Sequence, residues 1–326
     1  MKNKKIILVI SSFLIIVIII GILLLNNKEE AKVIRIGDLP VVQGLPLYVA
    51  IEKGYFKDAG INVERIKFEA PNQIVDALLQ DKIDFGSPSI ALGITGIAVF
   101  KNPGKLKIYA VSGGRIENPN ENLLVHKNSD VKSWEELKGK KLGILGGSIQ
   151  WRTITRELLN KHGLEMDKDI TVVELSPALQ VQALGSRQID ALLALEPMST
   201  VAIEQGIGKI IETAPVEKEI SNPFYGGAGV VRTQFAKENP ETTENVIKIF
   251  EKAMNEINEN PNMYKIYLKG NTPLNEGIIP KVPIVDFKSC GELSEEDLYA
   301  IQKFYDIFTK YKVIDGRISP KNILYC

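Results

Sequence analysis

Short apolar segments with strand character alternate with helical segments along most of this chain, from residue 33 onward. The first strands and helices are expected, in chain order, at residues 33–36, 46–53, 61–68, 72–80, 83–85 and 107–111. Such an alternation, with strands that are apolar along most of their length, is typical of a largely parallel sheet covered by helices. The sequence therefore predicts an α/β fold.

The middle of the chain repeats this scheme, with strands expected at 141–145, 170–175 and 189–195. Serine caps the start of a helix with its hydroxyl, and proline is tolerated in the first turn. Helix starts are expected at Ser87-Pro88, Ser148 and Ser176-Pro177, and a capping box at Ser133-x-x-Glu136.

Two stretches resemble each other at an offset of 106 residues. Residues 77–84 match residues 183–190, and at the same offset Gly37 falls on Gly143. Two readings remain open. Either two similarly built lobes stand in tandem, or common helix–turn–strand units coincide.

The character of the chain changes after Gly229. Long amphipathic helices are expected at 240–258 and 294–312, the second opened by Ser294-x-x-Asp297, with too few strands for a lobe of their own. We expect this C-terminal third to pack on the first lobe. Cys290 and Cys326 either form one disulfide, which would tie down the C-terminus, or stay apart, because sequence does not reveal proximity.

Residues 6–25 form an apolar run broken only by Ser11, Ser12 and Gly21. A helix of about 20 residues spans a hydrocarbon core of roughly 30 Å. Lysines at positions 2, 4 and 5 predict that residues 1–5 are cytoplasmic. The run exceeds the roughly 7–15 apolar residues of a signal peptide. We therefore favour an uncleaved transmembrane signal anchor over a cleaved signal, with a polar linker at 26–32.

Charge and motifs argue against several classes of protein. The 40 Lys+Arg residues balance 40 Asp+Glu, which argues against a nucleic-acid binder. The patterns G-x-S-x-G, G-x-x-x-x-G-K-[ST] and H-E-x-x-H do not occur. His126 is expected at a strand end on the surface and His162 at a helix end. With only two histidines and two cysteines, a metal site built from His and Cys ligands is not expected. We expect no catalytic residues, no metal and no cofactor.

Glycine, serine and aromatic residues gather where predicted strands pass into helices, at 38–46, 86–89, 146–151, 195–197 and 225–229. In open α/β sheets, ligands bind at such junctions, beyond the carboxyl ends of the strands. The candidate ligand-binding residues are Val42, Gln43, Gly44, Ser87, Ser89, Gly147, Ser148, Gln150, Trp151, Glu196, Tyr225 and Gly226.

Several of these segments resemble a known family. The matching motifs are Gly54-Tyr55-Phe56, Gly60-Ile61-Asn62-Val63-Glu64, Ile83-Asp84-Phe85-Gly86, Trp134-x-x-Leu137-Lys138-Gly139, Ile189-Asp190-Ala191 with Glu196-Pro197, and Glu238-Asn239-Pro240-Glu241. Over roughly residues 33–265 the chain resembles substrate-binding proteins of ABC importers. The group is that of nitrate, sulfonate, taurine and thiamin-pyrimidine binders (NMT1/THI5-like).

The resemblance implies a two-lobed periplasmic-binding-protein type II fold, preceded here by one N-terminal transmembrane helix. Lobe 1 is expected at 33–118, lobe 2 at 119–225, and a return to lobe 1 at 226–326. The chain would cross between lobes near Arg115–Leu124 and Tyr225–Arg232. The family also implies capture of a small ligand by hinge closure and delivery to permease and ATPase subunits. The receptor would be a monomer anchored in the cell membrane, with its binding domain outside.

Two ligand classes stay open. Serine and backbone N–H groups at helix starts suit a sulfonate, nitrate or carboxylate. Gln150, Trp151 and Glu196 suit a flat heterocycle with N–H donors, such as an aminopyrimidine. Two other functions also remain. One is a THI5-like or dehydratase-like enzyme on the same fold, and the other is a ligand sensor for a membrane signalling partner.

Overall fold

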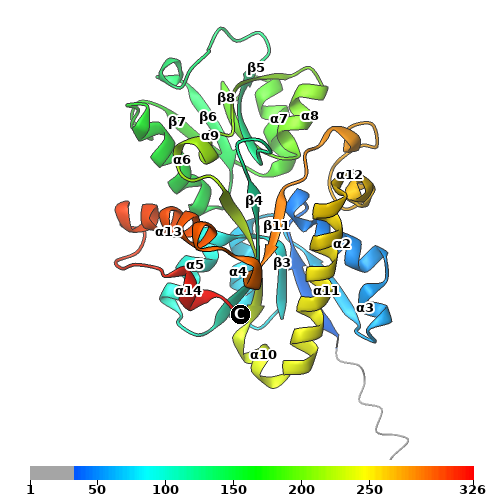
Figure 1. The fold of residues 1–326 in the computed structure, drawn as a ribbon. Coiled ribbons are helices and arrows are strands. Elements are labelled where there is room, and N and C mark those ends of the chain that lie inside the picture. Colours follow the sequence, from blue (N-terminus) through cyan, green and yellow to red (C-terminus); the bar gives the residue numbers. More distant parts are fainter. Residues whose placement is uncertain (1–32) are drawn as a thin grey trace, which may run out of the picture.

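The computed structural model describes residues 33–326, which form two sheets with helices packed against them (Figure 1). The predicted α/β fold is confirmed. The apolar run at 6–25 lies outside the described residues, so the predicted membrane anchor stays a prediction. Among residues 33–326, no helix has both the length and the apolar character needed to cross a membrane.

The first sheet has six strands in the order β11-β4-β10-β3-β1-β2. They are β1 (Ile34–Asp38), β2 (Val63–Lys67), β3 (Phe85–Ala91), β4 (Leu106–Gly114), β10 (Phe224–Arg232) and β11 (Asp286–Ser289). Strand β1 pairs in parallel with β2 and β3, whereas β10 runs antiparallel to β3 and β4.

The second sheet has five strands in the order β7-β6-β8-β5-β9. They are β5 (Glu121–His126), β6 (Lys141–Leu145), β7 (Thr171–Leu175), β8 (Ala191–Leu195) and β9 (Gly208–Thr213). Strand β6 pairs in parallel with β7 and β8, and β5 runs antiparallel to β8 and β9. All of its strands therefore come from one continuous part of the chain.

Helices cover both sheets. They are α2 (Leu45–Glu52), α3 (Tyr55–Asp58), α4 (Pro71–Leu79), α5 (Leu92–Lys101), α6 (Ile149–Lys161), α7 (Pro177–Gly185), α8 (Met198–Glu204), α9 (Pro215–Glu219), α10 (Thr233–Glu238), α11 (Pro240–Glu259), α12 (Pro261–Tyr264), α13 (Glu295–Lys310) and α14 (Pro320–Ile323). Short 3-10 turns lie at Val42–Gly44, Glu135–Leu137, Lys265–Leu268, Ile279–Lys281 and Cys290–Glu292.

Two predicted helix caps are confirmed. The Ser148 hydroxyl accepts the backbone N–H of Trp151 at 3.3 Å, and α6 ends just before His162. Ser294 and Asp297 form a reciprocal capping box at the start of α13. These side chains satisfy backbone N–H groups that have no partner inside the helix, which fixes where each helix begins.

Two other predicted caps are wrong. Ser87 and Pro88 lie inside β3, and the next helix begins only at Leu92. Strand β3 runs between β1 and β10, where its serine hydroxyls find partners within the fold. The segment 133–136 contains only a short 3-10 turn, in which Glu136 accepts the backbone N–H of Lys132 at 2.8 Å. Neither serine starts an α-helix, and for Ser87 tertiary burial inside the sheet overrides the local signal.

The chain passes between the sheets twice. Residues 115–120 join β4 to β5, which agrees with the first predicted crossing. The return runs through residues 214–223 and includes α9, whereas Tyr225–Arg232 already belongs to β10. The second predicted crossing was therefore placed too late in the sequence. We call residues 115–120 and 214–223 the connecting segments.

The two sheets repeat one arrangement at the offset of 106 residues. The Asp84 carboxylate accepts the backbone N–H of Arg35 at 3.1 Å, and Asp190 accepts that of Lys141 at 2.8 Å. Both aspartates therefore have a structural role. In the first sheet the aspartate before β3 thus bonds to the start of β1, and in the second sheet the aspartate before β8 bonds to the start of β6.

Two glycines occupy equivalent places in the repeat. A Cβ atom on Gly37 would lie 2.6 Å from the Cδ1 atom of Ile83, and one on Gly143 would lie 2.5 Å from that of Ile189. Either distance is too short for a side chain. The match in sequence therefore reflects two similarly built layers in tandem.

The C-terminal third packs mainly on the first sheet, as predicted. Helix α11 packs on α2 and β11, and α13 packs on β10, while α13 also contacts α6 of the second layer. Cys290 and Cys326 are joined as a disulfide, with their Cα atoms 5.9 Å apart. This bond fastens the last residue of the chain.

Candidate functional site

A cavity lies between the two sheets. About 540 Å³ in and around it is free of atoms, open solvent included, and the centre of a water-sized molecule can occupy about 40 Å³ of this. The first layer lines it with Leu39, Val41, Gln43, Pro71, Ser89, Ala91, Gly226 and Gly227. The second layer lines it with Leu145, Gln150, Trp151, Pro177, Gln180, Leu195, Glu196, Pro197 and Met198, and Asn120 comes from a connecting segment. The parallel strands β1, β6 and β8 all end here, as expected for a ligand site in such sheets.

The structure brings half of the predicted site residues together at this cavity. These are Gln43, Ser89, Gln150, Trp151, Glu196 and Gly226. Gln43, Gln150, Trp151 and Glu196 lie in junctions where a strand end meets a loop or helix, whereas Ser89 is inside β3 and Gly226 is inside β10. Their roles as ligand contacts stay predictions.

The other six predicted residues do not line the cavity and serve the fold. Val42 and Gly44 belong to the buried turn before α2, and Ser87 shares a hydrogen bond with Ser89 at 2.7 Å. Ser148 caps α6.

Gly147 and Tyr225 complete that group. The Gly147 N–H donates to Glu174 at 3.1 Å. The Tyr225 hydroxyl donates to Asp297 at 2.6 Å, and burial with that carboxylate raises the pKa of Tyr225. Both residues are therefore engaged within the protein and are not part of the cavity lining.

Sequence reasoning missed two polar residues of the lining. The Asn120 Oδ1 atom accepts the Nε2–H of Gln43 at 2.7 Å, and Gln43 Oε1 is buried without a partner among the described residues. Gln180, one turn into α7, is also buried against the cavity. The sequence signal for Gln180 was its position three residues after Pro177. Residues in the first turn of a helix lie near the strand ends at which ligands bind in such sheets.

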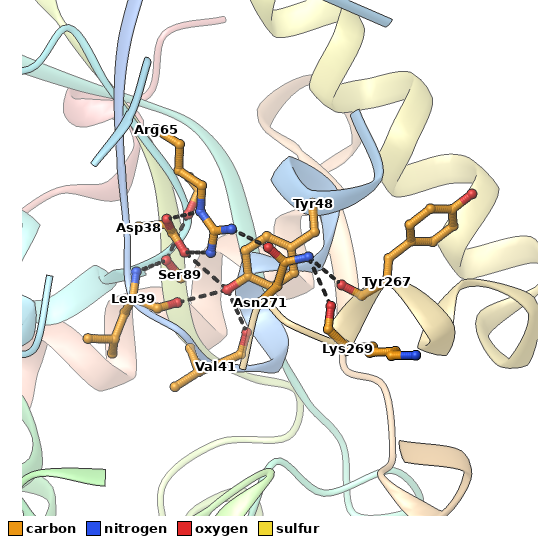
Figure 2. A network of polar contacts seen from close by, with 10 residues as sticks. Asp38, Leu39, Val41, Tyr48, Arg65, Ser89, Tyr267, Lys269 and Asn271 are labelled. Atoms are coloured by element: carbon orange, nitrogen blue, oxygen red, sulfur yellow. Dashed lines mark hydrogen bonds and ion pairs between the residues drawn. The ribbon is translucent and has the colours of Figure 1, made fainter. Parts of the chain in front are cut away.

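A buried ion pair holds the strand end that leads into the cavity. Arg65 of β2 donates from Nε to Asp38 Oδ1 at 2.7 Å and from Nη2 to Asp38 Oδ2 at 2.9 Å (Figure 2). The guanidinium lies 4.3 Å from the centre of the Tyr48 ring, whose hydroxyl donates to Asp38 at 3.0 Å. Burial raises the pKa of Tyr48, so this hydroxyl keeps its proton.

Further contacts extend this network to the lining. Arg65 also donates to the Asn271 side chain, which anchors it to the loop after α12 (Figure 2). The Leu39 N–H donates to Ser89 Oγ at 2.9 Å, and the Tyr48 hydroxyl lies 3.3 Å from the Val41 carbonyl. The network therefore positions the loop that carries the cavity residues Leu39 and Val41.

Comparison with known proteins identifies the family. The sequence pattern described as NMT1/THI5 like matches residues 42–263, more than half of the chain. The chain belongs to the NMT1/THI5-like family. This confirms the resemblance seen in the sequence motifs.

Relatives of this NMT1/THI5-like protein include binding proteins and an enzyme. A putative aliphatic sulfonates-binding protein of Bacillus subtilis is 28% identical. The alignment covers 91% of this chain and 86% of that protein. A 4-amino-5-hydroxymethyl-2-methylpyrimidine phosphate synthase of Saccharomyces cerevisiae is 22% identical, covering 83% of this chain and 79% of its own. Among solved structures, the periplasmic aliphatic sulphonate binding protein of Escherichia coli superposes with a TM-score of 0.69 at 20% identity. The match covers 90% of this chain and 97% of that protein. The last comparison shows that the two layers form the fold of periplasmic binding proteins.

Gln150 of this NMT1/THI5-like protein links the two layers directly. Its Oε1 atom accepts the backbone N–H of Gly93 at 2.6 Å, and its Nε2 atom donates to the Gly226 carbonyl at 3.0 Å. Gly93 lies on α5 and Gly226 on β10, both of the first layer, whereas Gln150 lies on α6. The side chain therefore lines the cavity and also fastens its two walls together.

Replacement of Gln150 by leucine is expected to lower the free energy of unfolding by about 2 kcal/mol, because a buried N–H and a buried carbonyl lose their partners. Urea denaturation measures this. Gln182→Leu is the matched control, since the Gln182 side chain is exposed on α7 and a change below about 0.5 kcal/mol is expected there. Equal effects of the two substitutions would contradict the bridging role.

Glu196 is the one ionisable residue in the lining formed by the described chain. It is 3% exposed, and its Oε2 atom accepts the backbone N–H of Thr200 in α8 at 3.1 Å. Loss of hydration raises the pKa of Glu196 to about 7, although the hydrogen bonds from Thr200 act in the opposite direction. The site thus presents a carboxyl group that changes charge near neutral pH.

Ion pairs and hydrogen bonds outside the cavity also join the layers. Glu157 of α6 accepts the Lys310 ammonium at 2.6 Å and the Tyr311 hydroxyl at 2.7 Å. Lys281 pairs with Glu204 of α8. These contacts hold the two walls against each other in the present arrangement.

Proposed function

We propose that this NMT1/THI5-like protein is the solute-binding component of an ABC importer. The fold of periplasmic binding proteins and the binding proteins among its relatives support this. The observation that carries the proposal is the cavity whose walls come from both layers. Permease and ATPase subunits would be its partners, and the N-terminal segment would hold residues 33–326 at the outer face of the cell membrane.

Capture would proceed by hinge closure. A ligand in this cavity touches both walls at once, so it binds the closed arrangement more tightly than an open one. The connecting segments 115–120 and 214–223 would form the hinge. The lobes would comprise residues 33–114 with 224–326, and residues 121–213.

The charge of the lining supports a heterocycle with N–H donors over a sulfonate or nitrate. No Lys, Arg or His side chain lines the cavity within residues 33–326, whereas Glu196 contributes a carboxyl group. Three of the helix starts at the cavity present Pro71, Pro177 and Pro197, which have no N–H for an anion, whereas α6 reaches it with Gln150 and Trp151. A buried oxyanion next to an ionised carboxylate would be destabilised.

The remaining groups suit a planar molecule. Trp151 is buried in the cavity wall and offers an aromatic face for stacking. Gln180, Asn120 and Gln43 can donate or accept hydrogen bonds at the edge of such a ring. Glu196 would accept one N–H of the ligand, and an aminopyrimidine has this combination of features.

A sulfonate is the second candidate ligand, favoured by the name of the Bacillus subtilis relative. The alternative function is that of an enzyme, because the Saccharomyces cerevisiae relative is a synthase. The two alternatives differ from our proposal in what a purified sample would bind or convert.

Thermal unfolding of the purified full-length protein with single compounds tests the proposal. The panel contains aminopyrimidines, thiamin, taurine, methanesulfonate and nitrate. A ligand at 100 times its dissociation constant adds about 2.7 kcal/mol, which raises the midpoint by a few degrees. We expect this shift with an aminopyrimidine and unchanged compound after incubation. Product formation on chromatography would favour the enzyme, and a shift only with a sulfonate would favour the second ligand.

A further inference from the structure

Two buried carboxyl groups lie where the connecting segments meet. Glu121 is the first residue of β5, directly after residues 115–120, and is 0% exposed. Glu217 lies on α9, inside residues 214–223, and is 2% exposed. The Ala214 N–H donates to the Glu121 carbonyl at 3.2 Å, so the two segments are also joined by their backbones.

No hydrogen bond of standard geometry reaches the four carboxyl oxygens of Glu121 and Glu217 from the described residues, although the nearby Val216 backbone and Asn120 act to lower their pKa values. The side chains nevertheless lie within hydrogen-bonding reach of each other. Two carboxylates accept hydrogen bonds and cannot donate one, so the contact is satisfied only when a proton lies between them. Gly114, at the end of β4, leaves the space that the Glu217 carboxyl fills.

The surroundings supply no direct counter-charge. Lys218, next to Glu217, lies 3.8 Å from Glu212 and contributes only at longer range. The other charged neighbours are engaged elsewhere or face solvent: Arg115 with Asp286, Lys161 with Glu219, His162 with Glu135, Glu204 with Lys281, Glu196 in the cavity and Glu117 at the surface. Helix α7 has no charged residue.

We propose that Glu121 and Glu217 share a proton in the native protein, and that this proton fastens the two connecting segments to each other. Loss of the proton leaves two adjacent buried charges, which repel each other and loosen the segments. The junction between the layers is therefore sensitive to pH. This inference does not depend on the ligand or on the transport role.

The sign follows from burial. Desolvation raises the pKa of both carboxyls in the folded protein. Contact with Glu217 raises the pKa of Glu121 further, whereas the hydrogen bond with Glu121 lowers the pKa of Glu217. The stabilisation is fully present at low pH. It is lost as the pH rises above the unfolded pKa of 4.5 and through the raised folded pKa values.

Infrared spectroscopy of the purified full-length protein tests the shared proton. We expect a protonated-carboxyl band at pH 7.5 that shifts in deuterium oxide. The part of this band that comes from Glu121 and Glu217 should disappear in each of the single variants E121Q and E217Q. E196Q separately identifies the cavity carboxyl, and E244Q controls for an exposed glutamate. Absence of the band in the wild-type protein overturns the proposal. So does a band of full intensity in all three variants E121Q, E217Q and E196Q. The wild-type spectra decide the matter even where a variant fails to fold.

Hydrogen exchange tests the fastening. After correction for intrinsic rates, protection of amides in 115–121 and 214–223 is expected to fall by up to about tenfold per pH unit above the pair's pKa. E217Q should flatten this dependence, because its amide can donate to an ionised Glu121 and no second buried charge forms. E244Q should behave like the wild type. Protection in these segments that is independent of pH in the wild-type protein overturns the fastening role.

Discussion

Replacement of Arg65 by methionine is expected to lower the free energy of unfolding by about 3–5 kcal/mol, because it leaves the buried Asp38 carboxylate without its cation. Asp38 is 0% exposed, and its ion pair with Arg65 also holds the strand end that carries Leu39. Denaturant unfolding measures the change. Ligand affinity should fall as well, since the cavity wall at Leu39 and Val41 loses its anchor.

Arg152→Met is the matched control. Arg152 pairs with Asp167 and Glu174, but all three side chains are about a third or more exposed. Such pairs contribute roughly 0–1 kcal/mol. The double substitution Asp38→Leu with Arg65→Met should recover part of the loss, because no charge is then left buried. Similar losses for Arg65→Met and Arg152→Met would contradict a special role of the buried pair.

Replacement of Glu196 by glutamine is expected to weaken binding of an aminopyrimidine tenfold to hundredfold, since a hydrogen bond to a charged acceptor contributes about 1.5–3 kcal/mol. In the wild-type protein, affinity should fall by roughly tenfold per pH unit below about 7, where Glu196 becomes protonated. The E196Q protein should lose this pH dependence. Calorimetric titration at several pH values measures both effects.

The same substitution should act oppositely on the unliganded protein. The pKa of Glu196 is about 7 in the folded state, so its burial costs stability increasingly as the pH rises from 4.5 through 7. E196Q should therefore be more stable than the wild type at pH 8, by about 3 kcal/mol at most. Glu165→Gln, an exposed glutamate paired with Lys168, is the control. Tighter ligand binding by E196Q would contradict the proposed acceptor role.

The order of strands and helices was predictable because periodicity and caps are local properties. The start of α6 at Ser148 and the capping box at Ser294 were both readable from a few residues. The fate of Ser87 and Pro88 depended on the position of β3 between β1 and β10, which local sequence does not reveal. Strong local signals were therefore overridden where the sheet buries them.

The site was predictable to the extent that it follows strand ends. Gln43 and Val42 are neighbours in one turn, yet Gln43 lines the cavity and Val42 packs in the core. Asn120 reaches the cavity only because the first connecting segment lies beside Gln43. Orientation within a turn and proximity between distant segments are tertiary properties, and they separated the predicted residues that line the cavity from those that do not.

Fluorescence titration of the purified full-length protein with an aminopyrimidine tests the central proposal most directly. Trp151 lines the cavity, whereas Trp134, the other of two tryptophans, does not. We predict a saturable change in emission with the aminopyrimidine, absent from Trp151→Phe and absent with taurine or nitrate. A saturable change with taurine or nitrate, and none with the aminopyrimidine, would contradict it.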